Sequence, residues 1–358
     1  MFPFVILLLV PICIQHLVLG NKKINYEKKN GIALAVFFVI FAVLVMLRHE
    51  SIGNDTRNYI RTFEKYCDMH WGGIAARTSE LGFACFVKTV SLVTKTPQVF
   101  LAITALVTTA MIYPTYKRLN ADPSLIIVIF SVMSTFVMTF SGIRQMLAVG
   151  IGIVAYEFTR RKKLIPFVIA VAIAMTFHVS AFMLAFMYPL YHVKITKKWL
   201  LFIVPVLVLM FVFNNQIFAV LGALLEQYTQ YDASITRTGA YTMIILFALF
   251  AVFAFLIPDE KRINRETIGL RNFLLFALVL QMFAPLHTIA MRMNYYYIIF
   301  IPLLLPQVIE CRSERWKQVA VLGRHVMVLF FLAYFFVNAY GGGNLNVFPY
   351  RFFWEAAA

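Results

Sequence analysis

The first fifty residues read MFPFVILLLVPICIQHLVLG (1–20), NKKINYEKKN (21–30) and GIALAVFFVIFAVLVMLRHE (31–50). Two long apolar runs thus enclose a short polar linker that carries four lysines. An apolar run of about 20 residues can cross a bilayer as a helix, and basic linkers favour the cytoplasmic side. The first run has no basic residues ahead of it and no small-residue cleavage pattern, so we interpret it as a retained span.

The composition of the whole chain supports the same fold class. Of the 358 residues, 61% are hydrophobic and only 13% are charged, which excludes a soluble globular core. A net charge of +16 would suggest nucleic acid as a partner of a soluble protein. Here the basic residues form short clusters between apolar runs, so they report membrane topology and predict no nucleic-acid partner.

Apolar runs along the chain predict an all-α, polytopic membrane protein with about 12 transmembrane helices. If every basic cluster is cytoplasmic, an even number of crossings must separate each pair of clusters. This parity test makes 81–93 an interfacial or re-entrant helix, and it requires the chain to turn back within 164–191. The expected spans are 1–20, 31–47, 97–116, 124–140, 142–159, 164–177, 179–191, 199–213, 241–257, 273–286, 294–309 and 320–338. The basic clusters are 21–30, 159–163, 192–198, 258–272 and 310–318.

The chain shows no internal repeat, and one transmembrane domain over residues 1–355 is the expected organisation. Its hydrophilic segments 48–80, 214–240 and 341–355 are predicted to be extracytoplasmic. The alanines at 356–358 are set aside as an artificial extension. Among the four cysteines, only Cys67 and Cys85 are expected to share an oxidising compartment, and their spacing gives a disulfide little support.

Three arginines, Arg48, Arg144 and Arg292, lie near the predicted outer ends of spans. A charge just inside the membrane is costly without a partner, so these residues indicate either an anionic ligand or contact with lipid headgroups. A guanidinium group suits phosphate because it stays charged and donates two parallel hydrogen bonds. Convergence of the three would predict a diphosphate site, although carboxylate sugars and anionic lipids would use the same groups.

His178, in MTFHVSAF, lies between two short spans, where an imidazole can act as a general base or hydrogen-bond a sugar hydroxyl. The alternative is a satisfied polar residue at a helix break. Glu50, Asp55 and Glu80 are carboxylate candidates for the same role, with a solvated loop charge as the alternative for each. Further polar residues at the outer ends are His49, Arg57, Gln145, His287 and Asn294. No zinc, P-loop, Rossmann or serine-triad signature is present.

Five short motifs, in order and spacing, resemble the EpsG family of exopolysaccharide proteins, which is grouped with the Wzy-type polysaccharide polymerases. The resemblance runs from about residue 30 to 300. The sequence departs from the family pattern at 54–57, where Arg57 adds an extra arginine. The motif residues are Arg48, Gly53, Asp55 and Tyr59 in RHESIGNDTRNYIRTF; Glu80, Gly82 and Phe83 in SELGF; Ile143, Arg144, Gln145 and Ala148 in SGIRQMLAV; Phe177, His178, Ser180 and Ala181 in FHVSA; and Arg292 and Tyr295 in MRMNYY.

This resemblance implies an inverting glycosyltransferase that joins undecaprenyl diphosphate-linked oligosaccharide repeats at the outer face of the bacterial cytoplasmic membrane. It implies a lipid-linked donor and acceptor, a flippase and a chain-length regulator as partners, and no metal or cofactor. The expected catalytic residues are His178, Glu50, Asp55 and Glu80. The expected substrate-binding residues are Arg48, Arg57, Arg144, Gln145, Arg292, Asn294 and Tyr295. The tyrosine run at 295–297 is also typical of an interfacial aromatic belt.

Three other activities are compatible with such a chain. An O-antigen ligase would use the same donor and the same arginines. A transporter of lipid-linked saccharides would place charges near the middle of several spans, whereas here they lie at the outer ends. An acyltransferase would need a deep histidine with a carboxylate partner reachable from the cytoplasm.

Overall fold

The computed structural model describes residues 1–19, 26–76, 78–119, 121–224, 237–340 and 345–355. These residues fold almost entirely into helices, and β-structure among them is limited to isolated bridges. The predicted all-α class is therefore confirmed. The chain forms two compact units, which are Met1–Ala185 with Leu322–Ala358, and Phe186–Val321.

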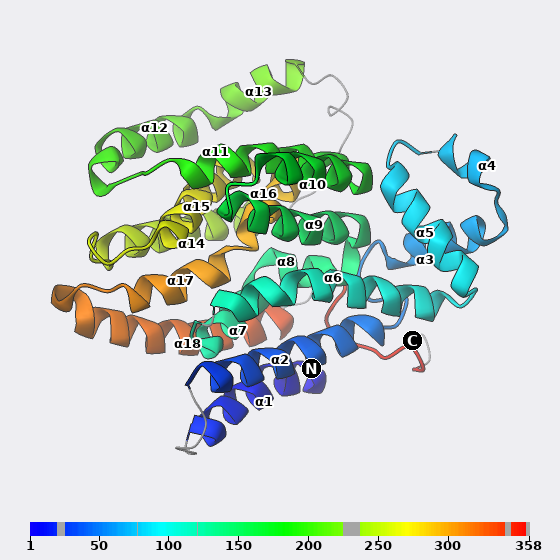
Figure 1. Ribbon diagram of the computed structural model, residues 1–358, viewed down its shortest axis with the longest axis horizontal. Coiled ribbons are helices and arrows are strands. Elements are labelled where there is room, and N and C mark those ends of the chain that lie inside the picture. Colours follow the sequence, from blue (N-terminus) through cyan, green and yellow to red (C-terminus); the bar gives the residue numbers. More distant parts are fainter. Residues whose placement is uncertain (20–25, 77, 120, 225–236, 341–344, 356–358) are drawn as a thin grey trace. The chain divides into compact units, whose positions relative to one another are not determined.

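In the first unit, long apolar helices lie side by side (Figure 1). Helix α1 (Phe2–Leu19) packs on α2 (Tyr26–Met46), α2 on α6 (Pro97–Leu119), and α6 on α9 (Ile143–Arg160). Helix α10 (Leu164–Phe177) forms a hairpin with α9. Because the two helices of a hairpin are antiparallel, the first residues of α9 and the last residues of α10 lie at the same end.

Three short helices lie at one end of these long helices, on the right of Figure 1. They are α3 (Thr56–Asp68), α4 (Trp71–Ala75) and α5 (Leu81–Val93). Helix α3 is amphipathic and buries the face that carries Tyr59, Phe63 and Tyr66. That face forms an apolar core with α5, α6 and the start of α9, so α3 packs as part of the unit.

Helix α5 begins and ends where the predicted interfacial segment does. At 1.5 Å per residue, its 13 residues span about 20 Å, less than the roughly 30 Å of a hydrocarbon core. Lys88, in the middle of this apolar helix, donates from Nζ to the carbonyl oxygens of Tyr66 (3.0 Å) and Cys67 (3.3 Å). These are unpaired carbonyls at the end of α3, so the lysine caps that helix.

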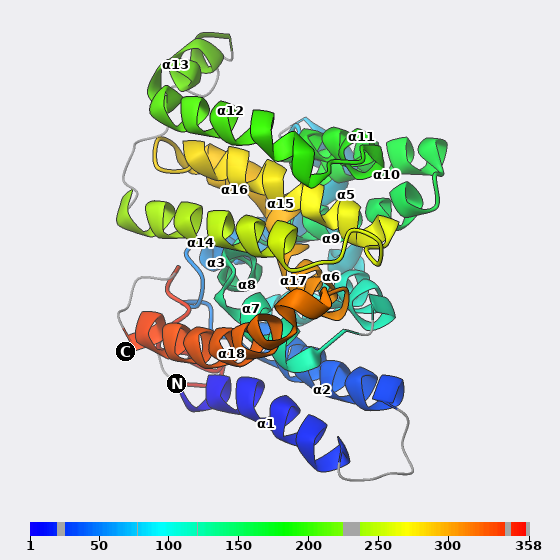
Figure 2. The same ribbon diagram turned by 90° about the vertical axis from the view of Figure 1, so that its left-hand side faces the viewer.

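In the second unit, α15 (Arg265–Phe283) packs against α11 (Met187–His192), α14 (Arg237–Leu256), α16 (Thr288–Ile298) and α17 (Ile301–Glu310) (Figure 2). It begins eight residues before the predicted span at 273–286, within the segment predicted to be a cytoplasmic loop. The reason is local. The Asn264 side chain caps the helix by accepting from the Thr267 N–H at 2.7 Å.

Two polar residues in this first part of α15, Arg271 and Asn272, bind partners inside the unit. Arg271 is fully buried, where it pairs with Glu260 at 3.1 Å, donates to the Ile195 carbonyl at 2.7 Å and stacks on the Phe255 ring. Asn272 donates to the carbonyls of Leu190 and Val193. Hydropathy alone predicts a loop for such polar residues, because it takes no account of the contacts they make with residues distant in the sequence.

The described residues support fewer membrane spans than the predicted 12. The described residues contain four helices long and apolar enough to cross a bilayer, or up to seven if each bent helix pair is one span. Several predicted spans are divided at breaks. The 124–140 run becomes two helices bent by 61°, and the 294–309 run becomes α16 and α17, bent by 40° close to Pro302.

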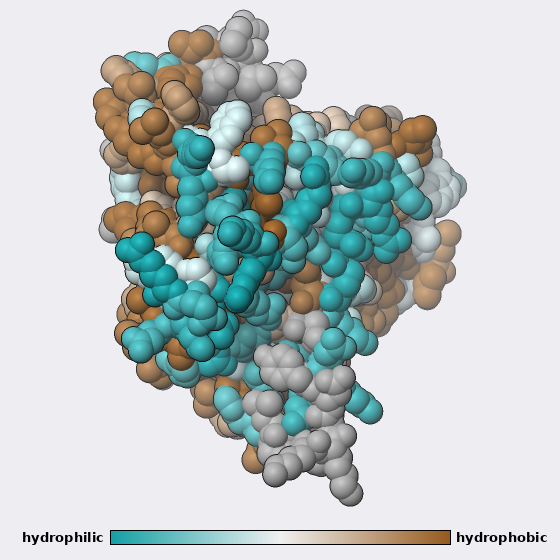
Figure 3. Space-filling view, turned by 60° about the vertical axis from the view of Figure 1, so that its left-hand side comes forward, coloured by the Kyte–Doolittle hydropathy of each residue, from teal (hydrophilic) through white to brown (hydrophobic). Residues whose placement is uncertain are grey.

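The hydrophilic segment 214–240, predicted to be an outer loop, contains helix, whereas the described residues of 341–355 contain none. The 214–240 segment holds α13 and the start of α14, while its residues 225–236 lie outside the described residues. On the face shown in Figure 3, exposed hydrophobic and hydrophilic side chains occupy separate areas.

The other helices are α7 (Pro123–Val132), α8 (Ser134–Ser141), η1 (Val179–Phe186), η2 (Lys197–Trp199), α12 (Leu200–Val212), α13 (Asn214–Leu224), η4 (Glu314–Trp316) and α18 (Lys317–Tyr340).

Candidate functional site

Three of the predicted site residues meet in the first unit. Glu80 is the N-cap residue of α5, Arg144 is the second residue of α9, and His178 is the C-cap residue of α10. The α9–α10 hairpin brings Arg144 and His178 to one end, and α5 packs against α10 there. We call Glu80, Arg144 and His178 the Glu80 cluster.

Glu80 is shared by the other two residues. Its Oε1 lies 2.7 Å from His178 Nδ1, and its Oε2 accepts from Arg144 Nη1. The Glu80 side chain is 9% exposed and that of His178 is 18% exposed, whereas Arg144 is 42% exposed. The carboxylate is therefore held inside the unit, while part of the guanidinium remains accessible.

Electrostatics keep this carboxylate charged. Burial alone would raise the pKa of the Glu80 carboxyl, but the hydrogen bond to His178 and the positive charge of Arg144 outweigh it. The pKa therefore lies below its ordinary value. At neutral pH the cluster contains an ionised carboxylate paired with a guanidinium.

Aromatic rings fix the position of the guanidinium. Arg144 Nε donates to the Tyr59 hydroxyl at 3.4 Å, and its Cζ lies 5.6 Å from the Tyr59 ring centroid and 5.8 Å from that of Phe83. Burial raises the pKa of Tyr59, although Arg144 partly offsets this effect, so the phenol stays protonated and accepts a hydrogen bond. Tyr59 and Phe83 carried the family resemblance, but the sequence did not indicate this positioning role.

Gly82 lets α5 approach α10 closely. A Cβ at this position would lie 2.0 Å from the Thr176 hydroxyl oxygen and 3.0 Å from a ring carbon of Phe177. Any larger residue would push the start of α5 away from the end of α10. Since Glu80 and His178 lie directly next to this contact in the chain, the glycine helps to set their separation.

The sequence profile of the EpsG family matches residues 31–352, which is nearly the whole chain. This chain belongs to the EpsG family. EpsG is a family of Wzy-type polymerases, so this member has a role in polysaccharide biosynthesis, and its apolar helices make it a multi-pass membrane protein. Comparison with curated proteins and with solved structures gives no match.

Arg48 occupies a different position in the first unit of this EpsG protein. It is fully buried, donates from Nη1 to the Val45 carbonyl and forms a backbone bridge with Phe352. Its Nε and Nη2 have no hydrogen-bond partner in the described part of the chain. Burial lowers the pKa of Arg48 to about 10, with Tyr350 acting in the opposite direction, so the side chain remains charged at neutral pH.

The predicted carboxylates Glu50 and Asp55 lie outside the Glu80 cluster. Glu50 pairs with Arg57 at 3.3 Å, with both side chains about half-exposed. Asp55 is the N-cap residue of α3, its side chain makes no capping hydrogen bond, and its N–H donates to Ser141 Oγ at 3.3 Å. Gln145 follows Arg144 and is buried.

The remaining predicted substrate-binding residues belong to α16 in the second unit. Asn294 is fully buried and donates to the Ala277 carbonyl at 2.9 Å and to Gln281 Oε1 at 3.1 Å, both on α15. Tyr295 is also buried, whereas Arg292 is partly exposed. Asn294 therefore joins two helices of its own unit. The convergence of Arg292 with the other arginines remains a prediction.

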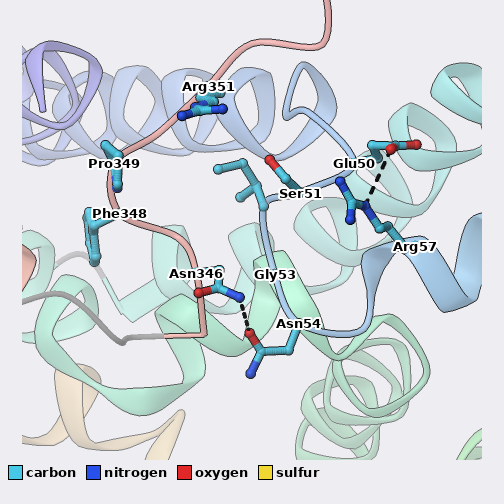
Figure 4. Close-up of a pocket in the computed structure, with 10 residues that line it drawn as sticks. Glu50, Ser51, Gly53, Asn54, Arg57, Asn346, Phe348, Pro349 and Arg351 are labelled. Carbon is cyan, nitrogen blue, oxygen red and sulfur yellow. Dashed lines mark hydrogen bonds and ion pairs between the residues drawn. The ribbon is translucent and has the colours of Figure 1, made fainter. Parts of the chain in front are cut away.

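A cavity of about 360 Å³ was missing from the sequence prediction (Figure 4). Residues of two segments line it, 50–57 and 346–351, and they include Glu50 and Arg57. The Arg351 and Asn346 side chains come from the C-terminal segment, which sequence analysis treated only as an outer loop.

Both cysteines of the weakly supported disulfide, Cys67 and Cys85, are free. In the described residues, no group of three or more His, Cys, Asp or Glu side chains is arranged to hold a metal.

Proposed function

We propose that this EpsG protein polymerises oligosaccharide repeats linked to undecaprenyl diphosphate, with the Glu80 cluster as the catalytic site. The supporting observation is one buried carboxylate that binds both an imidazole and a partly exposed guanidinium. These are the two groups that the reaction requires: a base for the acceptor hydroxyl and a cation for the departing diphosphate.

In this proposal, His178 is the general base. Its Nδ1–H donates to Glu80, which leaves Nε2 as the atom that takes the proton from the acceptor sugar hydroxyl. The acceptor oxygen forms a bond with the anomeric carbon of the donor repeat. The bond from that carbon to the diphosphate oxygen breaks, and its electron pair stays with the diphosphate. A single displacement of this kind inverts the anomeric centre.

Arg144 binds the diphosphate. Nη1 is engaged by Glu80 and Nε by Tyr59, which leaves Nη2 and the exposed edge of the guanidinium for phosphate oxygens. The pairing with Glu80 fixes the orientation of the Arg144 guanidinium before substrate binds, so less conformational entropy is lost on binding. Arg292 is a further candidate ligand for the same diphosphate, and this part of the proposal requires the two units to form one membrane domain.

The proposed setting is the bacterial cytoplasmic membrane with the Glu80 cluster facing outward. The support is the distribution of basic residues, since most lysines and arginines lie in segments predicted to be cytoplasmic. Arg144 and His178 lie at the opposite ends of α9 and α10 from the 159–163 cluster. A flippase that delivers the repeats and a chain-length regulator are the expected partners.

We propose different roles for the other predicted residues. Glu50 and Asp55 are not proposed as the base, because neither contacts an imidazole in the described residues. Arg48 is proposed as a structural cation beneath the C-terminal segment, because it is fully buried. Asn294 and Tyr295 support α16, which carries Arg292.

The test uses purified protein and a chemically defined, lipid-linked repeat as both donor and acceptor. We expect a ladder of products that differ by one repeat, with one undecaprenyl diphosphate released per new linkage. In a parallel reaction with added lipid A core, transfer of saccharide to that core without a ladder of lipid-linked products would instead support the ligase. Movement of the repeat across a vesicle membrane without a new linkage would support the transporter, and either result would overturn the proposal.

A further inference from the structure

The cavity between residues 50–57 and the C-terminal segment is well defined, because several hydrogen bonds join the C-terminal segment to residues 44–54. Asn346 Nδ2 donates to Asn54 Oδ1 at 2.8 Å, and the His49 N–H donates to the Arg351 carbonyl at 3.0 Å. The Tyr350 hydroxyl donates to the Leu44 carbonyl at 2.6 Å. The C-terminal segment thus returns to the end of α2 and closes one side of the cavity.

The lining of this cavity combines two kinds of chemistry. Ser51, Asn54 and Asn346 present hydroxyl and amide groups, and only one hydrogen bond joins the two amides. Arg57 and Arg351 bring guanidinium groups from opposite segments (Figure 4). The volume of about 360 Å³ lies within the ~300–1,000 Å³ range of pockets for small organic ligands.

The charge balance of the lining favours an anion. Arg57 is paired with Glu50, whereas Arg351 makes no side-chain hydrogen bond or ion pair within the described part of the chain. One positive charge of the lining is therefore unneutralised. The buried charge of Arg48, which lies next to the same C-terminal segment, adds to the positive potential.

We propose that this cavity binds an acidic saccharide. Amide and hydroxyl groups recognise the sugar hydroxyls, the exposed Pro349 ring faces the C–H side of the sugar, and Arg351 binds a carboxylate or phosphate substituent. A bare inorganic anion would use the arginine alone and would leave the amide groups without a function.

The cavity and the Glu80 cluster share structural elements. Arg57, in the first turn of α3, lines the cavity, and Tyr59, two residues later, contacts Arg144. The loop before α3 lies directly against the end of α8. A Cβ at Gly53 would be only 2.3 Å from the Phe140 carbonyl oxygen, and the φ of +83° also favours glycine, so this close contact requires a glycine. A growing glycan bound in the cavity would thus lie beside the elements that hold the catalytic residues. The source of the ligand rests on the proposed function, whereas its chemistry rests on the lining.

The test measures binding to full-length protein in detergent micelles by isothermal titration calorimetry, without any lipid-linked donor. The probes are a disaccharide with one glucuronic acid residue, its neutral glucose analogue and inorganic pyrophosphate. We expect the acidic disaccharide to bind at least tenfold more tightly than the neutral one, and Arg351→Gln to remove this preference. Arg351→Lys, which keeps the charge, should retain part of it, and Asn346→Ala should weaken both sugars.

Arg61→Gln is the matched control, because Arg61 is an exposed arginine of α3 that does not line the cavity. Equal binding of the two disaccharides, tighter binding of pyrophosphate to an Arg144→Ala protein, which lacks the proposed diphosphate ligand, or an unchanged preference in a folded Arg351→Gln protein would each overturn the inference. His178→Ala separates it from the proposed function. That variant should lose polymerisation and keep acidic disaccharide binding.

Discussion

Replacing Glu80 by glutamine tests the Glu80 cluster with the smallest change in shape. The carboxylate accepts from two donors, with His178 on Oε1 and Arg144 on Oε2. Glutamine keeps one acceptor oxygen, and its NH₂ group would face the other donor. One of the two partners must therefore turn away. A buried donor left without a partner costs about 1–3 kcal/mol.

The larger effect is expected on the reaction rate. General base catalysis contributes about 10²–10⁴-fold, and it depends on the orientation of the imidazole. We therefore expect Glu80→Gln to lower the initial rate of ladder formation by a factor within this range. Glu80→Asp, which keeps both carboxylate oxygens, should recover part of the rate.

The assay compares initial rates with purified variants and the same lipid-linked repeat, together with the thermal unfolding of each variant. Glu64→Gln is the matched control, since Glu64 is an exposed glutamate of α3 in the same unit. A folded Glu80→Gln protein with a rate within threefold of the wild type would refute the role of Glu80. An equal loss in Glu64→Gln would show that the effect is not specific to the cluster.

Three further predictions concern the scaffold of the site. Gly53→Ala should destabilise the protein by more than about 1 kcal/mol, because of the positive φ and the contact with the carbonyl of α8, whereas Gly31→Ala, which meets no atom within 4 Å, should not lower the unfolding temperature. Lys88→Met should cost about 1–3 kcal/mol by leaving the Tyr66 carbonyl at the end of α3 without its lysine partner, whereas Lys95→Met should cost less in the same unfolding experiment, because Lys95 is exposed and the Cys67 carbonyl it binds keeps its bond to Lys88. Because the pKa of Glu80 is lowered in the folded protein, its contribution to stability is complete above the ordinary value of about 4.5 and is lost as the pH falls through the folded value. Acidification below 4.5 should therefore destabilise the wild type more than Glu80→Gln, and an equal loss in both would contradict the pKa shift.

Residue type and position along the spans placed Glu80, Arg144 and His178 in a longer list of candidate residues. Ionisable side chains at the ends of apolar helices are rare, and Arg144 and His178 stood out for that reason. Their pairing through Glu80 was not predicted, because it depends on how α5 packs against the α9–α10 hairpin. That packing needs the close approach at Gly82, which is a tertiary property.

Other features required contacts between distant parts of the chain. Arg48 looked like a diphosphate ligand from its place after the second apolar run, yet the C-terminal segment covers it completely. The 346–351 segment has no helical or strand periodicity, so its sequence does not predict that it packs against residues 44–54. Asn294 is a polar residue within an apolar sequence, which made it a candidate site residue. The same property lets it join α16 to α15 through hydrogen bonds.

The predicted count of spans exceeds the four to seven that the described helices support, because hydropathy counts apolar residues without regard to breaks in the helix. The chain bends at Met133, inside a run that is apolar throughout, and η1 interrupts regular helix directly after His178. The turn at His178 was anticipated from the need to keep the basic clusters on one side.

The central claim is that His178, held by Glu80, drives formation of a new glycosidic bond. Its most direct test is a single-turnover experiment on wild-type and His178→Ala protein, with one lipid-linked donor repeat and one labelled acceptor repeat. We expect the wild type to form the joined product and release undecaprenyl diphosphate in equal amounts, and His178→Ala to do so at least about 10²-fold more slowly. Equal rates in the two folded proteins, or no joined product with the wild type, would contradict the claim.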